Sequence, residues 1–166
     1  VETWKALIDI QKSGRVRSIG VSNFKEPALR EIIDVTGVVP VLNQIELHPW
    51  SQKPDLIAWM TANGIAPIAY SSLVPLSTWR STPGQASAKT DQMRADGGVF
   101  TQMATKYGVS EAQLLLRWGV QNGYAVLPKS LNPDRMRKNC DLFSFAIDDA
   151  DMALIATMDR GDGVAW

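Results

Sequence analysis

The chain has little of several residue types, and each shortage excludes a class of protein. Its single cysteine, Cys140, excludes a disulfide within the chain and is typical of a reducing, cytosol-like compartment, so we expect a cytoplasmic protein. Lysine and arginine together number 17, as do aspartate and glutamate. No net charge therefore favours nucleic acid or an anionic membrane as a partner. No apolar run approaches the roughly 18 residues that a membrane-spanning helix needs.

Ligand-binding motifs are equally sparse. One histidine and one cysteine, without clustered carboxylates, give no metal-ligand spacing, so we expect no metal site. No GxGxxG motif follows a strand-like run, which leaves a Rossmann fold without support. In contrast, 45% of the residues are hydrophobic and 20% are charged. A chain of 166 residues with this composition can bury one core, and we expect a single globular domain over residues 1–166.

Strand-like and helix-like segments alternate along the chain. Four apolar runs rich in β-branched residues predict strands: "SIGVSNF" (18–24), "VLNQIEL" (41–47), "PIAYSSL" (67–73) and "YAVLPKS" (124–130). The segments between them have apolar residues three or four apart and end at the glycines Gly37, Gly64 and Gly123, where a left-handed helix cap would lie. This alternation predicts a parallel sheet in an α/β fold, because each return to a parallel neighbour needs a long right-handed crossover.

Capping signals support the predicted helices. Pro54 and Pro133 suit the first turn of a helix, Ser110 and Gln113 fit a capping box, and Asp148 suits the N-cap of a last helix over 148–159. The chain also opens on Val1 inside a helical pattern. We therefore expect it to be a piece of a longer protein.

One segment breaks the alternation. Residues 74–98 are rich in serine, threonine, glycine and alanine and show little periodicity. A connection of this length is usually functional or disordered, so we expect a long flexible loop after the third strand. Trp79 and Trp50 would be aromatic residues near the same rim.

Polar residues collect where the predicted strands end, which in a β/α barrel is the active face. Lys129 and Ser130 end the fourth run, and Arg135 lies one turn into the next helix. We name these three residues the anion cluster. Their side chains, together with free N–H groups at the helix N-terminus, predict a phosphate site. The alternative is that Lys129 is only a solvated strand end.

Two further features leave alternatives open. Gln44, Glu46 and His48 alternate along the second run, so they share a face. Glu46 and His48 could act as acid and base, or they could form a hydrogen-bonded polar layer in the interior. Tyr70 could stack on a planar ring of a ligand or could fill the core.

Four motifs in order then carry a resemblance over nearly the whole chain: "GRVRSIGVSNF", "VLNQIELHP", "AYSSL" and "LPKSLNPDRMRKN". The sequence resembles the C-terminal half of an aldo-keto reductase, a family of (β/α)8 TIM barrels that reduce aldehydes and ketones with NADPH. The resemblance implies that Ser22, Asn23 and Gln44 hold the nicotinamide carboxamide. It also implies that Tyr70 stacks on the nicotinamide ring.

The resemblance implies a second set of contacts toward the phosphates. Ser71 and Leu73 would lie by the pyrophosphate, Asn139 would approach the adenine, and Leu131 would complete the cofactor-binding set. The anion cluster would hold the 2′-phosphate of the adenosine, which favours NADPH over NADH.

The sequence also departs from the family pattern. Val74 and Pro75 stand where many members have a small residue and a serine that contacts the pyrophosphate. Lys138 replaces an acidic residue that often contacts adenine. The catalytic Asp, Tyr, Lys and His of the family precede the segment that this chain resembles, and His48 is not that histidine. The resemblance therefore implies that no tyrosine of this chain has the lysine of that catalytic set as a partner to lower its pKa, which leaves the catalytic residues unknown.

Half a barrel leaves two sheet edges unpaired. The expected partner is an N-terminal barrel half, which would make this chain the cofactor-binding half of a carbonyl reductase. Alternatively, two copies could close a barrel as a homodimer that has lost reductase activity. Such a dimer could bind another small ligand or catalyse a non-redox cyclisation or isomerisation. A third possibility is a structural or regulatory partner of another reductase.

Overall fold

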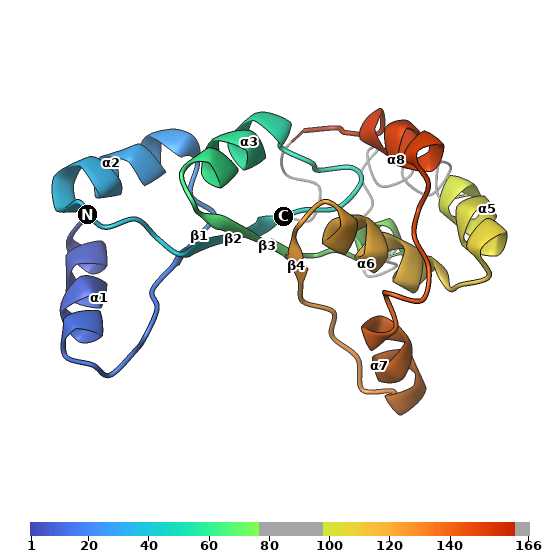
Figure 1. The fold of residues 1–166 in the computed structure, drawn as a ribbon, viewed down its shortest axis with the longest axis horizontal. Helices are drawn as coiled ribbons and strands as arrows, with labels where there is room; N and C mark the ends of the chain where they lie inside the picture. Colours follow the sequence, from blue (N-terminus) through green and yellow to red (C-terminus); the bar gives the residue numbers. More distant parts are fainter. Residues whose placement is uncertain (77–97, 162–166) are drawn as a thin grey trace, which may run out of the picture. The chain divides into compact units, whose positions relative to one another are not determined.

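The structure is a computed structural model that describes residues 1–76 and 98–161 (Figure 1). The chain divides into two compact units, each described by itself below. The first unit comprises Val1–Ile45 and Lys53–Ile68, and the second comprises Glu46–Gln52 and Ala69–Trp166.

Four strands form one parallel sheet in the order β1-β2-β3-β4. They are β1 (Val21–Ser22), β2 (Leu42–Glu46), β3 (Ala66–Tyr70) and β4 (Ala125–Val126). The sequential order confirms the predicted alternation, since each strand joins its parallel neighbour through a helical crossover. The strands are shorter than the predicted runs. The run 124–130 keeps only β4, because Pro128 has no N–H with which to continue the ladder.

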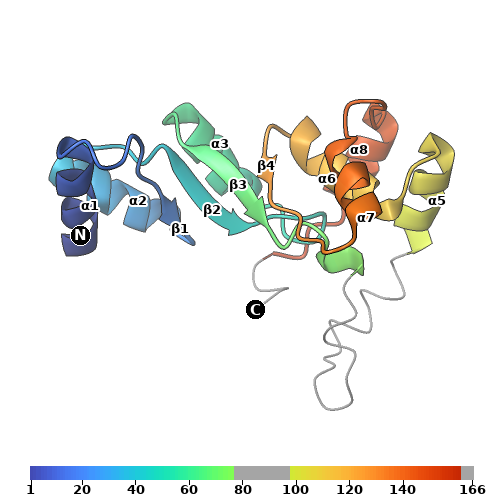
Figure 2. The same ribbon diagram turned by 90° about the horizontal axis from the view of Figure 1, so that it is seen from below.

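The first unit holds three helices: α1 (Glu2–Lys12), α2 (Glu26–Thr36) and α3 (Pro54–Ala62). Its core is a cluster of four buried side chains, Trp4, Ile8, Ile19 and Ile32. The indole N–H of Trp4 donates to the backbone oxygen of Val38 at 3.3 Å, which satisfies the polar atom of the buried ring. Figure 2 shows α3 beside β2 and β3.

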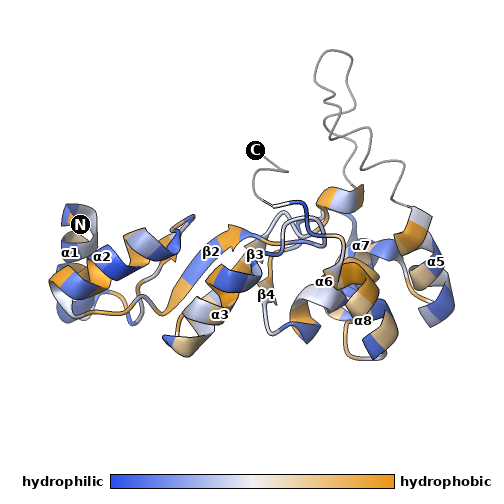
Figure 3. Ribbon diagram, turned by 90° about the horizontal axis from the view of Figure 1, so that it is seen from above, coloured by the Kyte–Doolittle hydropathy of each residue, from blue (hydrophilic) through white to orange (hydrophobic). Residues whose placement is uncertain are grey.

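In the described part of the second unit lie η1 (Val74–Leu76), α5 (Gly98–Tyr107), α6 (Glu111–Gln121), α7 (Pro133–Cys140) and α8 (Asp149–Ala156). Buried Leu114, Leu115 and Trp118 show which side of α6 meets the core. The predicted capping box is confirmed, since the Ser110 side chain accepts from the Gln113 N–H and the Gln113 side chain accepts from the Ser110 N–H. Hydrophobic and hydrophilic residues both appear along the helices, as expected for helices with one buried side (Figure 3).

Part of the predicted flexible loop and its rim can be compared with the structure. Val74–Leu76 form η1, whereas residues 77–97, with Trp79, lie outside the described residues. Trp50 is only 1% exposed. Its ring packs against Phe100 with centroids 5.8 Å apart, and the Arg160 guanidinium lies 5.2 Å from the ring centroid. The Trp50 indole, four residues past the end of β2, is therefore buried, and its place near the rim stays a prediction.

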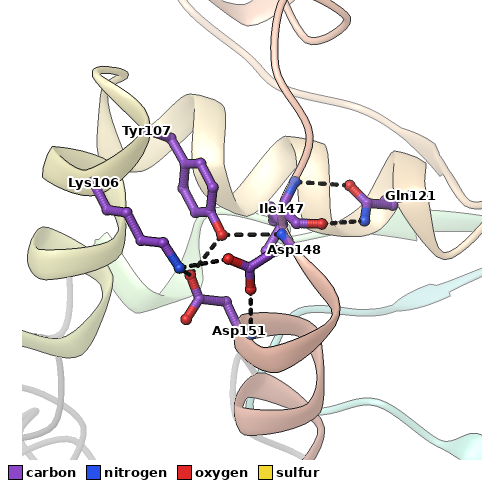
Figure 4. A network of polar contacts seen from close by, with 6 residues as sticks. All are labelled: Lys106, Tyr107, Gln121, Ile147, Asp148 and Asp151. Carbon is purple, nitrogen blue, oxygen red and sulfur yellow. Dashed lines mark hydrogen bonds and ion pairs between the residues drawn. The ribbon is translucent and has the colours of Figure 1, made fainter.

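A polar network joins α5 to α8 (Figure 4). We call it the α5–α8 network, and its members are Lys106, Tyr107, Asp148 and Asp151. The Lys106 ammonium lies 2.6 Å from an Asp148 carboxylate oxygen and 2.9 Å from one of Asp151. Asp148 also caps α8, as expected, by accepting from the Asp151 N–H at 2.9 Å. The hydrogen bond from Lys106, aided by that backbone N–H, lowers the pKa of Asp148 from 3.8 to about 2.

The lowered pKa predicts how acid weakens the network. Since the folded-state pKa lies below the unfolded value, the stabilisation is fully present above about pH 3.8 and is lost as the pH falls toward about 2. Asp148→Asn keeps an oxygen for the Asp151 N–H but removes the charge. We expect it to lower the thermal midpoint near neutral pH and to flatten the acid limb of the stability profile.

Circular dichroism melts between about pH 7 and 2 would test this, with Asp149→Asn as the control that removes the same charge one position away. An equal flattening in both variants would refute the specific role of Asp148.

Close packing of α6 on β4 gives a second prediction. A Cβ added at Gly119 would lie 2.9 Å from Cγ1 of Val126, which is too close. Gly119→Ala should therefore destabilise the fold by about 1–3 kcal/mol through overpacking. That penalty should exceed the roughly 1 kcal/mol that alanine gains over glycine in a helix.

The double variant Gly119→Ala with Val126→Ala should recover part of the loss, because it removes the clashing methyl group. Urea unfolding would measure both variants. A single Gly119→Ala variant that is more stable than the parent would contradict the packing argument.

Candidate functional site

Three residues predicted to hold the nicotinamide lie together in the first unit. Ser22 is the last residue of β1, Asn23 follows it, and Gln44 pairs with Ser22 in the parallel register. The Asn23 N–H and the Ser22 hydroxyl both donate to the Gln44 backbone oxygen, each at 2.9 Å. Asn23 has φ of 61°, a left-handed conformation that asparagine tolerates well. The chain therefore turns out of β1 at Asn23, one of the residues predicted to hold the nicotinamide.

The chemistry of these three side chains suits a primary amide. Ser22 and Asn23 are exposed and Gln44 is half-buried. Since the Ser22 hydroxyl donates its proton to the backbone, its oxygen remains an acceptor. The two side-chain amides carry both donors and acceptors. This set can pair with both the NH2 group and the oxygen of a carboxamide.

The residues that end β3 form a tight turn in the second unit. Tyr70, half-buried, is the last residue of β3. Ser71 follows with φ of 58°, and its backbone oxygen accepts from the Val74 N–H at 3.0 Å. The Leu73 oxygen accepts from the Leu76 N–H at 2.9 Å, which winds the chain into η1. Tyr70, Ser71 and Leu73 therefore lie directly at the strand end, as the sequence predicted.

The N-terminus of α7 differs from the sequence expectation. The Asn132 side-chain oxygen accepts from the N–H groups of Asp134 and Arg135 at 2.9 and 3.0 Å, and its backbone oxygen accepts from Met136 at 3.0 Å. Pro133 has no N–H. The expectation of free N–H groups for an anion is therefore wrong, because the N-cap asparagine already binds them.

With the Asp134 and Arg135 N–H groups bound by Asn132, charged side chains remain to attract an anion at α7. Lys129 lies in the loop after β4, three residues past the strand end, and is exposed, as is Arg135. Within residues 1–76 and 98–161, neither forms an ion pair with a carboxylate. Asp134, the acidic residue of α7, pairs instead with Arg137 at 2.7 Å. The positive charge of Lys129 and Arg135 is therefore available to a ligand.

The other predicted residues around α7 have different environments. The Ser130 hydroxyl accepts from the Asn132 N–H at 3.2 Å, which fixes it just before the helix. Leu131 is 92% exposed, and Asn139 is half-buried in the last turn of α7. An apolar side chain this exposed has surface to offer a ligand. The second unit thus brings Lys129, Ser130 and Arg135 into one short segment, with Leu131 between them.

The Glu46–His48 pair favours the structural interpretation over the catalytic one. His48 is 0% exposed and Glu46 is 5% exposed, and the His48 Nε2 lies 2.8 Å from the Glu46 carboxylate. His48 Nδ1 accepts from the Trp50 N–H at 3.3 Å, so Nε2 carries the proton that is donated to Glu46. Both ring nitrogens are engaged and the ring is buried. The arrangement is a hydrogen-bonded polar layer.

Tyr107 lies beside Lys106, yet its pKa is raised rather than lowered. The Lys106 ammonium lies 5.1 Å from the centroid of the Tyr107 ring. Burial raises the pKa of Tyr107, and its hydrogen bond to Asp151 at 2.6 Å raises that pKa further. The pair is therefore wrong for a tyrosine acid, which needs a lowered pKa. Lys106 and Tyr107 are adjacent in sequence, which is a local signal for their contact. No such signal indicates the contact with Asp151, which lies more than 40 positions away.

Over 1–76 and 98–161, no three histidine, cysteine or acidic residues gather as they would around a metal ion. Over the same residues, no helix combines the length and the apolar character that crossing a membrane requires.

Solved structures similar to this chain belong to one family. An aldo/keto reductase from Brucella melitensis matches with a TM-score of 0.77 and 38% identity, over 95% of this chain and 55% of that one. The Bombyx mori aldo-keto reductase in complex with NADP matches with a TM-score of 0.83 and 34% identity, over 98% of this chain and 51% of that one. Four parallel strands with helices, aligned with half of such barrels, identify the fold as part of a (β/α)8 barrel.

Relatives found by sequence similarity lead to the same family as the solved structures. The chain is 38% identical over 161 residues to 2,5-diketo-D-gluconic acid reductase B of Corynebacterium sp. (strain SHS752001), and 40% identical over 164 residues to morphine 6-dehydrogenase of Pseudomonas putida. Each match covers 97% of this chain and 53% of the relative, so the chain spans about half the length of these relatives. The pattern of the aldo/keto reductase family matches residues 1–160. The chain therefore belongs to the aldo/keto reductase family.

Proposed function

We propose that this chain is the cofactor-binding part of an NADPH-dependent reductase that converts aldehydes or ketones to alcohols. The observation that carries the proposal is the segment 129–135, where cationic side chains without acidic partners precede and begin α7. The Bombyx mori relative is in complex with NADP, and relatives include reductases such as the methylglyoxal reductase DkgA of Escherichia coli. These matches support a nicotinamide cofactor with a 2′-phosphate.

The 2′-phosphate would be held by side chains. The planar Arg135 guanidinium can bind two phosphate oxygens at once, while the Lys129 ammonium acts as a point charge. Ser130 would donate its hydroxyl proton to a third oxygen. Because Asn132 already binds the N–H groups of the first helical turn, charge on these side chains decides affinity.

The nicotinamide end would be held by neutral hydrogen bonds. Ser22, Asn23 and Gln44 supply the acceptors and donors that a carboxamide needs, and the ring of Tyr70 would stack on the nicotinamide. Bound NADPH supplies a hydride to a carbonyl carbon. The residues of this chain orient the ring that carries the hydride and fix which face is presented.

The proton for the carbonyl oxygen needs a separate donor. Tyr107 donates its hydroxyl proton to Asp151, and the buried His48 ring is engaged at both nitrogens. We therefore propose that the proton donor lies in the part of the family barrel that this chain does not span. The non-redox and regulatory functions considered from the sequence gain no support, since the relatives named above are reductases and a dehydrogenase.

Charge at α7 gives the first functional prediction. Arg135→Ala should lower the binding affinity for NADPH by roughly tenfold or more while changing the affinity for NADH by less than about twofold, because only NADPH carries the 2′-phosphate. Arg137→Ala is the matched control, since it removes the same charge from the same helix but from a residue already paired with Asp134. Isothermal titration calorimetry with both cofactors would measure the losses. Equal losses of NADPH and NADH affinity in Arg135→Ala would remove the phosphate role.

A residue that contacts the nicotinamide should affect the binding of NADPH and NADH equally. Asn23→Gly keeps the left-handed backbone conformation at no steric cost and removes only the side-chain amide. This variant should lower the affinities for NADPH and NADH by the same factor, about three- to tenfold, since both cofactors share the carboxamide. Fluorescence titration of the reduced cofactors would report this. A loss confined to NADPH, or none at all, would show that Asn23 does not contact the nicotinamide.

A further inference from the structure

We propose that Lys138 is an additional specificity-determining residue that places a second cation from α7 on the 2′-phosphate. This inference rests on the proposed function of the anion cluster. By the family resemblance, Lys138 stands in place of an acidic residue that often contacts adenine. Its position in α7 supports a different role.

Helical spacing puts Lys138 beside Arg135. The two residues are three apart in α7, so their side chains leave the helix on neighbouring parts of its surface. Both are exposed. Arg137 lies between them in sequence, and it pairs at 2.7 Å with Asp134, which is one turn before Lys138. The ion pair therefore uses the only acidic side chain of α7 and leaves two neighbouring cations without one.

The surroundings of Lys138 leave its side chain free to move. It lines an open hollow of about 600 Å³ that is also lined by Ser110 and Gln113 at the start of α6 and by Asp141 after α7. No ion pair joins Lys138 to Asp141 or to any other acid in the described chain. Because the flexible four-carbon side chain of Lys138 has no acidic partner among the described residues, its ammonium can turn toward a phosphate bound at Arg135.

Charge balance gives the physical reason for a second cation. A phosphate monoester carries about −1.5 to −2 charges near pH 7, which is more than one guanidinium neutralises. Like charges three residues apart on one helix repel each other until an anion lies between them. The Arg135 fork would take two oxygens of the phosphate, and the Lys138 ammonium would approach the third. Because a 2′-hydroxyl carries no charge, Lys138 would discriminate between NADPH and NADH.

The experiment is a binding comparison of NADP⁺ and NAD⁺ by calorimetry, in low and in moderate salt, on the purified protein. Lys138→Ala should lower the affinity for NADP⁺ by about three- to fivefold, as expected for the loss of an exposed ion pair, and leave the affinity for NAD⁺ unchanged. Lys138→Glu should weaken NADP⁺ by roughly tenfold or more. The loss in Lys138→Ala should shrink as salt rises, because the contact is electrostatic.

Arg137→Ala is the control for the net charge of α7, and it should change NADP⁺ affinity by less than about twofold. Equal effects of Arg137→Ala and Lys138→Ala would overturn the proposal, because both would then act only through net charge. If Lys138→Ala kept normal NADP⁺ affinity while Arg135→Ala lost much of it, the proposed role of Lys138 would be wrong and that of Arg135 would stand. If neither variant affected NADP⁺, the proposed function of the anion cluster would fail as well.

Discussion

Parallel pairing of β1 with β2 places the polar residues of the first unit where they can act. The register sets Ser22 opposite Gln44, and the Gln44 backbone oxygen accepts from both Ser22 and Asn23. Because parallel strands cannot be joined by a tight turn, the chain must leave β1 through α2 before it returns. The left-handed Asn23 starts that departure. A single backbone carbonyl of β2 therefore holds both the Ser22 side chain and the Asn23 backbone at the end of β1.

The proposed anion site in the second unit would have to work without a free helix N-terminus. Asn132 satisfies the first turn of α7 with its own side chain, so the helix is stable without a ligand. In the proposed site, recognition would depend on charged side chains that have no acidic partner among the described residues. The stability of α7 would then be separate from the affinity for a cofactor, and that affinity would be sensitive to the loss of a single cation.

Local patterns in the sequence were enough to predict most of the elements. Apolar spacing and the caps at Ser110, Pro133 and Asp148 located α6, α7 and α8 to within a few residues, because capping depends on neighbours within one turn. The strand ends were less accurate, since pairing depends on the partner strand as well as on the run itself. Pro128 was the local signal that β4 stops early.

Contacts between distant residues escaped sequence analysis. Tyr107 meets Asp151 across 44 positions, and Trp50 is covered by Arg160. No periodicity encodes such pairs, so the burial of Trp50 was not predicted. The cap at Asn132 is different, because Asn before Pro is a local signal. Its consequence for the anion could have been drawn from sequence, since an asparagine N-cap binds the N–H groups that an anion would need.

The most direct test of the account is phosphorus-31 NMR of NADP⁺ titrated with the protein, because the 2′-phosphate and the pyrophosphate give separate resonances. The account predicts that binding shifts the 2′-phosphate resonance and lowers the pKa of that phosphate, since nearby cations favour its more highly charged form. A 2′-phosphate whose resonance and pKa stay at their free values while the pyrophosphate resonances shift would contradict it. The cationic side chains around α7 would then have no part in holding the cofactor.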